Sequence, residues 1–184
     1  QLALMTPSPE IEDAKRDLSE MEQTLDEYLA FAKGASEEAP ATVDLGALAE
    51  EVAHECARTG VDIAIERTGE VQTPGRARAL KRCLSNLIDN AAAHGDKVRV
   101  SVTGEANAIS VSVDDNGPGI PEELYEEAFR PFSRLDETRS RNQKGVGLGL
   151  AIARDVARSH GGEIYLRQSP LGGLRATLRV PRPA

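Results

Sequence analysis

The order of two kinds of apolar pattern along the chain is the feature that most constrains its fold. In short runs, apolar residues alternate with polar ones, as they do along one face of a β-strand, and these runs come mostly in adjacent pairs. Segments with helical spacing separate the pairs. This order predicts an α+β fold, a two-layer α/β sandwich in which one mixed sheet carries helices on one face.

The strands and helices can be placed by residue number. The predicted helices are a short one capped by Asp44 and others over about 76–94, 121–129 and 147–160. The predicted strands are centred on 61–65, 98–102, 109–113, 164–166 and 174–180. Aromatic residues make up 3% of the chain and Trp is absent, so the core must consist of Leu, Ile, Val and Ala.

A separate pattern precedes these elements, with apolar residues alternately three and four positions apart. Its members are Ile11, Ala14, Leu18, Met21, Leu25, Tyr28 and Ala32. This is the a/d seam of a long coiled-coil or bundle helix. A lone helix cannot bury such a seam, which favours a four-helix bundle across a two-fold axis over packing on its own domain. We therefore expect a partial helical hairpin at 1–34, a linker at 35–43 and a globular domain at 44–184.

Charge and composition exclude several classes of protein. The formal net charge of -8 argues against non-specific binding of nucleic acid. Cys56 and Cys83 lie far apart among apolar neighbours, as small core residues do, rather than in a disulfide framework or metal site. We find no signal peptide and no apolar run near the roughly 20 residues of a membrane span. Gln1 does not resemble a natural start, so we expect a soluble piece of a longer protein.

Asp115 ends a predicted strand on its inward side, because it continues the alternation of residues 109–113. A buried carboxylate is costly unless a partner satisfies it. The strand ends in Asn-Gly-Pro-Gly, where Gly117 and Gly119 permit a sharp turn and the close approach of a ligand. Asp115 could accept a hydrogen bond from a ligand amino group, or it could simply form the turn.

Two further patterns suit a phosphorylated ligand. Asn86, Asn90 and His94 are four residues apart and stack on one helix face, where amide oxygens would suit a hydrated Mg²⁺ held also by phosphates. The alternative is an exposed polar helix edge. Alternating glycines within 145–149 open an apolar helix whose free amides could bind an anion. The basic run 133–144 before them could be a lid over phosphates or an ordinary surface loop.

Together these elements resemble the catalytic domain of sensor histidine kinases, over about residues 44–181. The motifs that carry the resemblance are Asn86-x₃-Asn90, Asp115-Asn-Gly-Pro-Gly, Phe129-Arg-Pro-Phe132-Ser-Arg134, Gly145-Val-Gly-Leu-Gly-Leu-Ala-Ile and His160-Gly-Gly. They are similar to the N, G1, F and G2 boxes in order and spacing. The set is specific, although each motif alone is not. The resemblance implies the Bergerat-type ATP fold. The helix before it looks like the second helix of the dimerisation and phosphotransfer domain and is similar to that of osmosensor-type kinases.

The resemblance implies ATP and Mg²⁺ as cofactors. Asp115 would receive the adenine amino group, Asn90 with help from Asn86 would hold Mg²⁺, and Arg134 would reach the phosphates from a lid that Phe132 anchors. Asn86 and Arg134 are the expected catalytic residues. The expected nucleotide-binding residues are Asn86, Asn90, His94, Asp115, Gly117, Gly119, Ile120, Phe132, Arg134, Lys144, Gly145, Val146, Gly147, Leu148, Gly149 and Leu150.

The implied activity is transfer of the ATP γ-phosphate to a histidine, for relay to a response regulator. In this family the acceptor histidine lies in the first dimerisation helix, which the chain lacks. The expected partners are therefore ATP, a phosphoacceptor helix of the same or a partner protomer, a response regulator and a second protomer, without nucleic acid. The resemblance also implies a cytoplasmic domain of an inner-membrane sensor protein.

Some positions depart from the family's pattern. Ala93 stands where Lys or Arg is usual and cannot contact phosphate, and His94 stands where an aromatic residue is common. His54 lies in the first helix of the globular domain without the expected proline, and His160 at a helix end reads as structural. None of the three histidines therefore suits the role of phosphoacceptor.

Two rival functions remain. An adaptor with a vestigial kinase domain should have lost the Asn, Asp or Gly ligands, which this sequence keeps. An ATPase of the chaperone, gyrase or mismatch-repair kind typically carries a catalytic Glu where Asn86 stands. Asn86 therefore favours transfer to a protein over hydrolysis.

Overall fold

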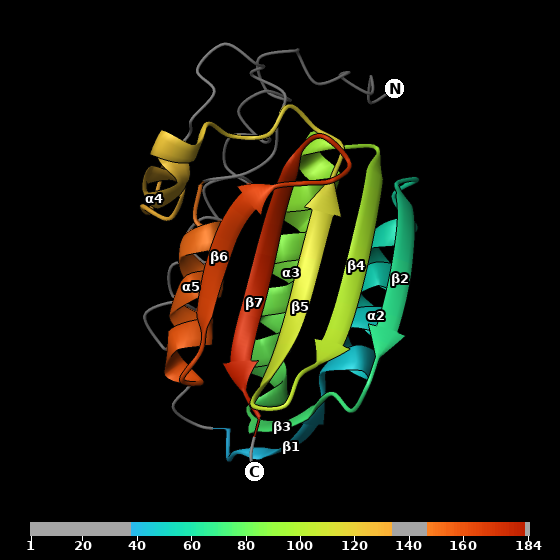
Figure 1. Ribbon diagram of the computed structural model, residues 1–184, viewed down its shortest axis with the longest axis vertical. Helices are drawn as coiled ribbons and strands as arrows, with labels where there is room; N and C mark the ends of the chain where they lie inside the picture. The colour runs from blue at the N-terminus through green and yellow to red at the C-terminus, as the bar shows by residue number, and fades with distance from the viewer. Residues whose placement is uncertain (1–37, 134–146, 183–184) are drawn as a thin grey trace, which may run out of the picture. The chain divides into compact units, whose positions relative to one another are not determined.

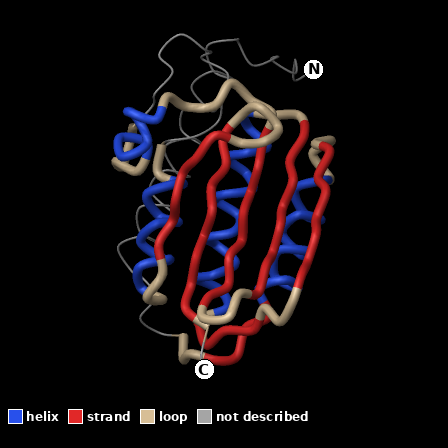
Figure 2. Tube along the Cα trace, in the orientation of Figure 1, coloured by secondary structure: helices blue, strands red, loops and turns tan. Residues whose placement is uncertain are grey.

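The computed structural model describes residues 38–133 and 147–182, and the structural statements below refer to these residues. The helix predicted at the start of the chain lies outside them. The elements are β1 (Ala41–Asp44), α2 (Leu45–Ala57), β2 (Asp62–Thr68), β3 (Gln72–Gly75), α3 (Ala77–His94), β4 (Lys97–Gly104), β5 (Ala108–Asp115), η1 (Glu122–Leu124), α4 (Tyr125–Ala128), α5 (Gly149–Ser159), β6 (Glu163–Gln168) and β7 (Leu174–Pro181), and Figure 2 shows their course. None of the described helices combines the length and apolarity that crossing a membrane requires.

Five strands form one mixed sheet in the order β2-β4-β5-β7-β6. β2 and β4 are parallel, and the other neighbouring strands are antiparallel. Helices α2, α3 and α5 cover one face of this sheet, and no described element covers the other (Figure 1). The predicted α+β sandwich, with a mixed sheet and helices on one face, is therefore confirmed.

The hydrophobic core lies between the sheet and the three helices. The central strands contribute the alternating side chains that the sequence predicted, Val98, Val100, Val102, Ile109, Val111 and Val113. From the other side, α3 contributes Leu80, Leu84, Leu87 and Ile88, which are all buried. Burial of one such aliphatic side chain contributes about 1.5–3 kcal/mol. Because α3 packs along the middle of the sheet, the helix edge that carries Asn86, Asn90 and His94 lies at a fixed distance from β5.

The short strands β1 and β3 form a second, two-stranded sheet that the sequence did not predict. β1 includes residues 41–43 of the predicted linker. β3 was not predicted because it contains Pro74, and proline is rare inside strands. Thr73 secures this small sheet by donating a hydrogen bond to the carbonyl oxygen of Pro181, at 3.0 Å. Glu38 also joins the domain, because its carboxylate accepts the Arg78 N–H at the start of α3. Part of the expected linker is thus folded onto the domain.

Asp44 caps α2 as predicted, because its Oδ1 accepts the N–H of Ala47 at 2.9 Å. The cysteines are also buried and free, as the sequence indicated. Burial raises the pKa of the Cys83 thiol to about 12, so this thiol stays protonated and behaves as an apolar core group.

His160 has the structural role that its position predicted. Its Nε2 accepts the N–H of Arg76 at 3.1 Å, and its Nδ1 lies 2.8 Å from the carbonyl oxygen of Val156. The proton of the ring must therefore sit on Nδ1, which donates to that carbonyl. The imidazole ties the end of α5 to the start of α3.

We expect His160→Ala to lower the free energy of unfolding by about 1–3 kcal/mol, because the Arg76 N–H loses its acceptor. Urea unfolding followed by circular dichroism measures this change. His54→Ala is the matched control, since His54 is exposed on α2 and should tolerate the change. Equal midpoints for the two variants would contradict the structural role of His160.

Candidate functional site

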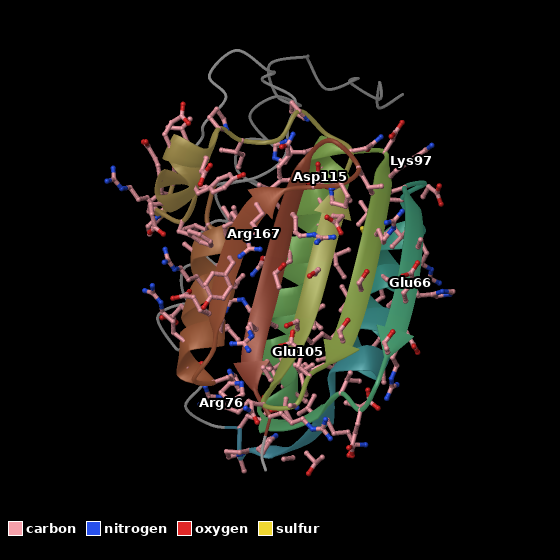
Figure 3. The ribbon with its side chains drawn as sticks, in the orientation of Figure 1. Glu66, Arg76, Lys97, Glu105, Asp115 and Arg167 are labelled. Atoms are coloured by element: carbon pink, nitrogen blue, oxygen red, sulfur yellow. The ribbon has the colours of Figure 1, made fainter. Side chains whose placement is uncertain are left out.

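Asp115 is the centre of a polar site at the end of β5 (Figure 3). The residue is 3% exposed. Its Oδ1 accepts two backbone N–H groups, that of Gly117 at 2.8 Å and that of Leu174 at 3.2 Å. No described residue contributes a hydrogen bond to the other oxygen, Oδ2. The carboxylate is therefore held in place through one oxygen and offers the second to a ligand.

Burial shifts the titration of this carboxyl group. It raises the pKa of Asp115 above the ordinary value, and the N–H groups of Gly117 and Leu174 and the nearby His94 oppose the rise. Burial therefore disfavours the ionised form of Asp115, and a buried acid with a shifted pKa is a candidate functional residue.

Glycines surround Asp115 because no larger residue fits there. A Cβ on Gly117 would lie 2.5 Å from the His94 carbonyl oxygen. Gly119 has a φ of +70° and packs against the carbonyl of Gly173. A Cβ on Gly173 would collide with Oδ1 of Asp115, and the N–H of Gly173 donates to the Asp115 carbonyl oxygen at 3.1 Å. These glycines bring two turns of the chain directly against the carboxylate.

Gly173 and Leu174 are site residues that sequence reasoning missed. They were assigned only to the turn and strand of the last hairpin. The Gly-Gly pair was the only local signal, and it indicates a turn in many settings. Asn116, which follows Asp115, has a structural role. Its side chain accepts the N–H groups of Asp96 and Lys97 and joins β5 to the start of β4.

The polar stripe on α3 links this site to the start of α5. His94, at the end of the stripe, lies beside Gly117 and Asp115. Asn86, two turns earlier, faces Gly149, where a Cβ would lie 3.6 Å from the Asn86 amide oxygen. The Nδ2 of Asn86 is buried and has no hydrogen-bond partner among the described residues. Asn90 lies between them and is partly buried. Sequence reasoning thus correctly placed these residues on one face.

Two left-handed residues join the segment after α4 to the start of α5. Phe132 has a φ of +65° and Gly147 a φ of +77°, and the Phe132 N–H donates to the Gly147 carbonyl oxygen at 3.0 Å. Phe132 is a costly residue for this conformation. The glycine is required, because a Cβ there would lie 2.7 Å from the Ser133 carbonyl oxygen.

The predicted anchoring of the lid by the Phe132 side chain stays a prediction, because the lid lies outside the described residues. In the described part of the chain the Phe132 ring is 56% exposed. The buried aromatic ring is that of Phe129, and the guanidinium of Arg154 lies 4.3 Å above it. Arg154 also pairs with Glu126 and Glu163, both at 3.0 Å. The motif Phe-x-x-Phe did not reveal which ring faces inward.

The remaining predicted residues have different outcomes. Leu148 and Leu150 are buried at the start of α5, and Ile120 packs against the core. They shape the site through packing. Arg134, Lys144, Gly145 and Val146 lie outside the described residues, so their predicted contacts with phosphate stay predictions.

The arrangement offers two complementary ends. One end presents a buried hydrogen-bond acceptor at Asp115, and the other presents the amide groups of α5 and an unpartnered Asn86. Asn86 and His94 are eight residues apart, which corresponds to about 12 Å along a helix. A ligand with a hydrogen-bond donor at one end and negative charge at the other matches this site.

The fold and the site define a class of nucleotide-binding ATPase domains. The family model of histidine kinase-, DNA gyrase B-, and HSP90-like ATPases matches residues 75–184. The sensor histidine kinase GtrS of Pseudomonas aeruginosa is 40% identical over 168 residues, which cover 91% of this chain and 34% of GtrS. The sensor histidine kinase CpxA of Escherichia coli is 41% identical over 108 residues, or 58% of this chain and 24% of CpxA. The chain thus spans about a third of the length of GtrS and less of CpxA.

Solved structures agree. The ATP binding domain of PrrB from Mycobacterium tuberculosis has a TM-score of 0.67 and 30% identity, covering 80% of this chain and 100% of that one. The histidine kinase domain of the Escherichia coli osmosensor EnvZ has a TM-score of 0.62 and 31% identity, covering 82% and 94%. The chain therefore belongs to this ATPase family, and its matched domain is the ATP-binding catalytic domain of a sensor histidine kinase.

We expect Gly173→Ala to weaken ATP binding at least about tenfold, because the added methyl group displaces the carboxylate, whose hydrogen bond to a ligand is worth about 1.5–3 kcal/mol. Isothermal titration calorimetry measures the change. Gly172→Ala is the control, since a Cβ there meets no atom within 4 Å. Gly172 has a φ of +109°, so the control also measures the backbone strain of the same turn. Equal affinities in both variants would show that the tight contact is unimportant.

Proposed function

We propose that this domain binds ATP with Mg²⁺ and transfers the γ-phosphate to a histidine on a separate helix. The observation that carries the proposal is the buried Asp115, whose Oδ1 is satisfied by two backbone N–H groups while Oδ2 is left for a ligand. A carboxylate oriented in this way accepts a hydrogen bond from an amino group, such as that of adenine. Gly117 and Gly119 allow the chain to turn tightly beside Asp115, which shapes the proposed adenine pocket.

The phosphate end of the site is proposed to lie between α3 and the start of α5. The amides at the start of α5 attract an anion, and Gly149 adds no side chain at that helix end. We assign phosphate contacts from the preceding segment to Arg134, Lys144, Gly145 and Val146. These positions match the family's lid and glycine motifs, and the cations Arg134 and Lys144 would stand in for the contact that Ala93 cannot make.

Asn90 and Asn86 are the proposed residues for Mg²⁺. The buried, unpartnered amide of Asn86 fits a site that is completed by a ligand. Amide oxygen and nitrogen exchange places by rotation, so the side chain can turn its oxygen to a metal ion or its nitrogen to a phosphate oxygen. When bound, the metal ion neutralises charge on the phosphates. The protein's own contribution is to hold the phosphates in line and to shield them from water.

Transfer to a protein is favoured over hydrolysis because Asn86 cannot act as a general base. An amide has no proton-accepting group of suitable strength, so no side chain at this position activates water. The described histidines do not suit the acceptor role either. His160 uses both ring nitrogens in structural hydrogen bonds. His54 lies in α2 of the ATP domain without the proline of the acceptor motif, and His94 ends α3 beside Asp115. We therefore place the acceptor on a dimerisation helix of the same or a partner protomer.

The wider assignments follow from the same proposal. Residues 1–34 would be part of the dimerisation and phosphotransfer hairpin, and the full-length protein would be a homodimer. It would pass the phosphate to an aspartate of a response regulator, from the cytoplasmic side of an inner-membrane sensor. The rival role of a vestigial adaptor is disfavoured, because Asn86, Asn90 and Asp115 are all retained.

We expect Asp115→Asn to abolish measurable ATP binding while the fold survives. The amide oxygen can still accept the N–H groups of Gly117 and Leu174, but its NH₂ group repels the adenine amino group. Because burial raises the pKa of Asp115, the neutral amide should cost no stability at pH 7. Calorimetry with Mg²⁺ and thermal unfolding measure the two effects. Unchanged ATP affinity in this variant, or no binding by the unaltered chain, would refute the nucleotide site.

A second experiment tests the transfer step. We expect the chain, given γ-labelled ATP and a separate polypeptide with the first dimerisation helix, to label the acceptor histidine. Asn90→Ala should lower the rate at least about tenfold, the loss typical of removing one electrostatic contact to the transferring group. His54→Ala is the control and should leave the label unchanged. Label that appears on His54, or never on the added helix, would exclude the proposed acceptor.

A further inference from the structure

A second aspartate, Asp114, lies next to the site but on the opposite face of the sheet. Its side chain is 0% exposed, although no described helix or strand covers that face. Arg175 of β7 provides the cover: its Nε and Nη2 donate to Oδ1 and Oδ2 of Asp114, both at 2.8 Å. Such a two-pronged contact fixes both the distance and the angle between the two side chains.

The ion pair between Asp114 and Arg175 lies at the end of the strands that is nearest to Asp115. Asp114 and Arg175 are the last paired residues of β5 and β7 at the ligand end of the sheet. The next residues along, Asp115 on β5 and Leu174 on β7, point to the helical face and make the hydrogen bond that orients the carboxylate. Any slip between the two strand ends at Asp114 and Arg175 therefore moves the Leu174 N–H away from Asp115.

The fit at this point leaves little room for such a slip. Gly173 packs so closely on Asp115 that no Cβ is tolerated, and its N–H donates to the Asp115 carbonyl oxygen. The backbone ladder pairs β5 with β7 as far as Asp114 and Arg175, and the nearest side-chain hydrogen bond on the same face, between Ser112 and Thr177, joins two neutral hydroxyl groups. A neutral hydrogen bond is weaker than a charged, two-pronged one.

We propose that Asp114 and Arg175 are positioning residues of the adenine subsite. Their ion pair clamps the end of β7 to the end of β5, so that Asp115 presents its free oxygen to the 6-amino group of the base. The pair thereby sets the preference for adenine without touching the nucleotide. This inference rests on the proposed role of Asp115.

The test compares two nucleotides that differ only in the group that Asp115 would recognise. ATP carries the 6-amino group, and purine riboside triphosphate lacks it. Calorimetry with Mg²⁺ gives a dissociation constant for each nucleotide, and their ratio measures recognition of the amino group. A loss of general stability would weaken both nucleotides alike and leave this ratio unchanged.

Arg175→Lys is the main variant, because it keeps the positive charge beside the buried Asp114 but cannot make two parallel hydrogen bonds. Asp114→Asn weakens the same contact from the other side. We expect both to lower the ratio at least about fivefold, part of the roughly tenfold or greater effect of a hydrogen bond to a charged group. Arg179→Lys is the matched control: Arg179 lies on the same strand and face, pairs with Glu105 at 3.3 Å and is far from the ligand end.

The outcomes separate the inference from the function beneath it. If the unaltered chain binds both nucleotides equally, Asp115 does not recognise the amino group and the proposed adenine contact fails. If the unaltered chain prefers ATP and Arg175→Lys keeps that preference, the function stands and the clamp is refuted. An equal fall in the ratio for Arg175→Lys and Arg179→Lys would also refute it, because position along the strand would then be irrelevant.

Discussion

The burial of one carboxylate, that of Asp115, is the constraint on which the rest of the site depends. A carboxylate at 3% exposure needs hydrogen bonds, and two backbone N–H groups from different turns supply them to one oxygen. Those turns can approach only because Gly117 and Gly173 lack side chains. Burial raises the pKa of Asp115, and no described residue bonds its second oxygen. In the proposed function, a ligand supplies the missing hydrogen bond.

Helix α3 converts this local arrangement into a site that is long enough for a nucleotide. Its apolar face packs on the middle of the sheet, which fixes the rotation of the helix. That rotation places Asn86, Asn90 and His94 in a line between the start of α5 and the glycines around Asp115. The packing of α3 on the sheet therefore sets the distance between Asp115 and the start of α5.

Both faces of the sheet contribute to the site, although only one face borders it. On the helical face, Asp115 and the glycines are the proposed contacts with a ligand. On the open face, the Asp114–Arg175 ion pair joins the same two strand ends, and we propose that it holds them in register. Because successive residues of a strand point to opposite faces, adjacent aspartates have separate tasks. The strained Phe132 and the left-handed Gly147 play a similar part at the other end, by closing the segment before α5 with a backbone hydrogen bond.

The fold class, the inward-facing Asp115, the polar line on α3 and the glycines at the start of α5 could all be predicted from the sequence. Each of these follows from spacing within one element, where the periods of strand and helix are fixed. The burial of Phe129 rather than Phe132, the pairing of β1 with β3 and the contacts of Gly173, Leu174 and Arg175 with Asp115 and Asp114 required the folded structure. The Leu174 N–H reaches Asp115 across 59 residues of sequence. Contacts over such separations depend on how strands pair, and local periodicity carries no information about pairing.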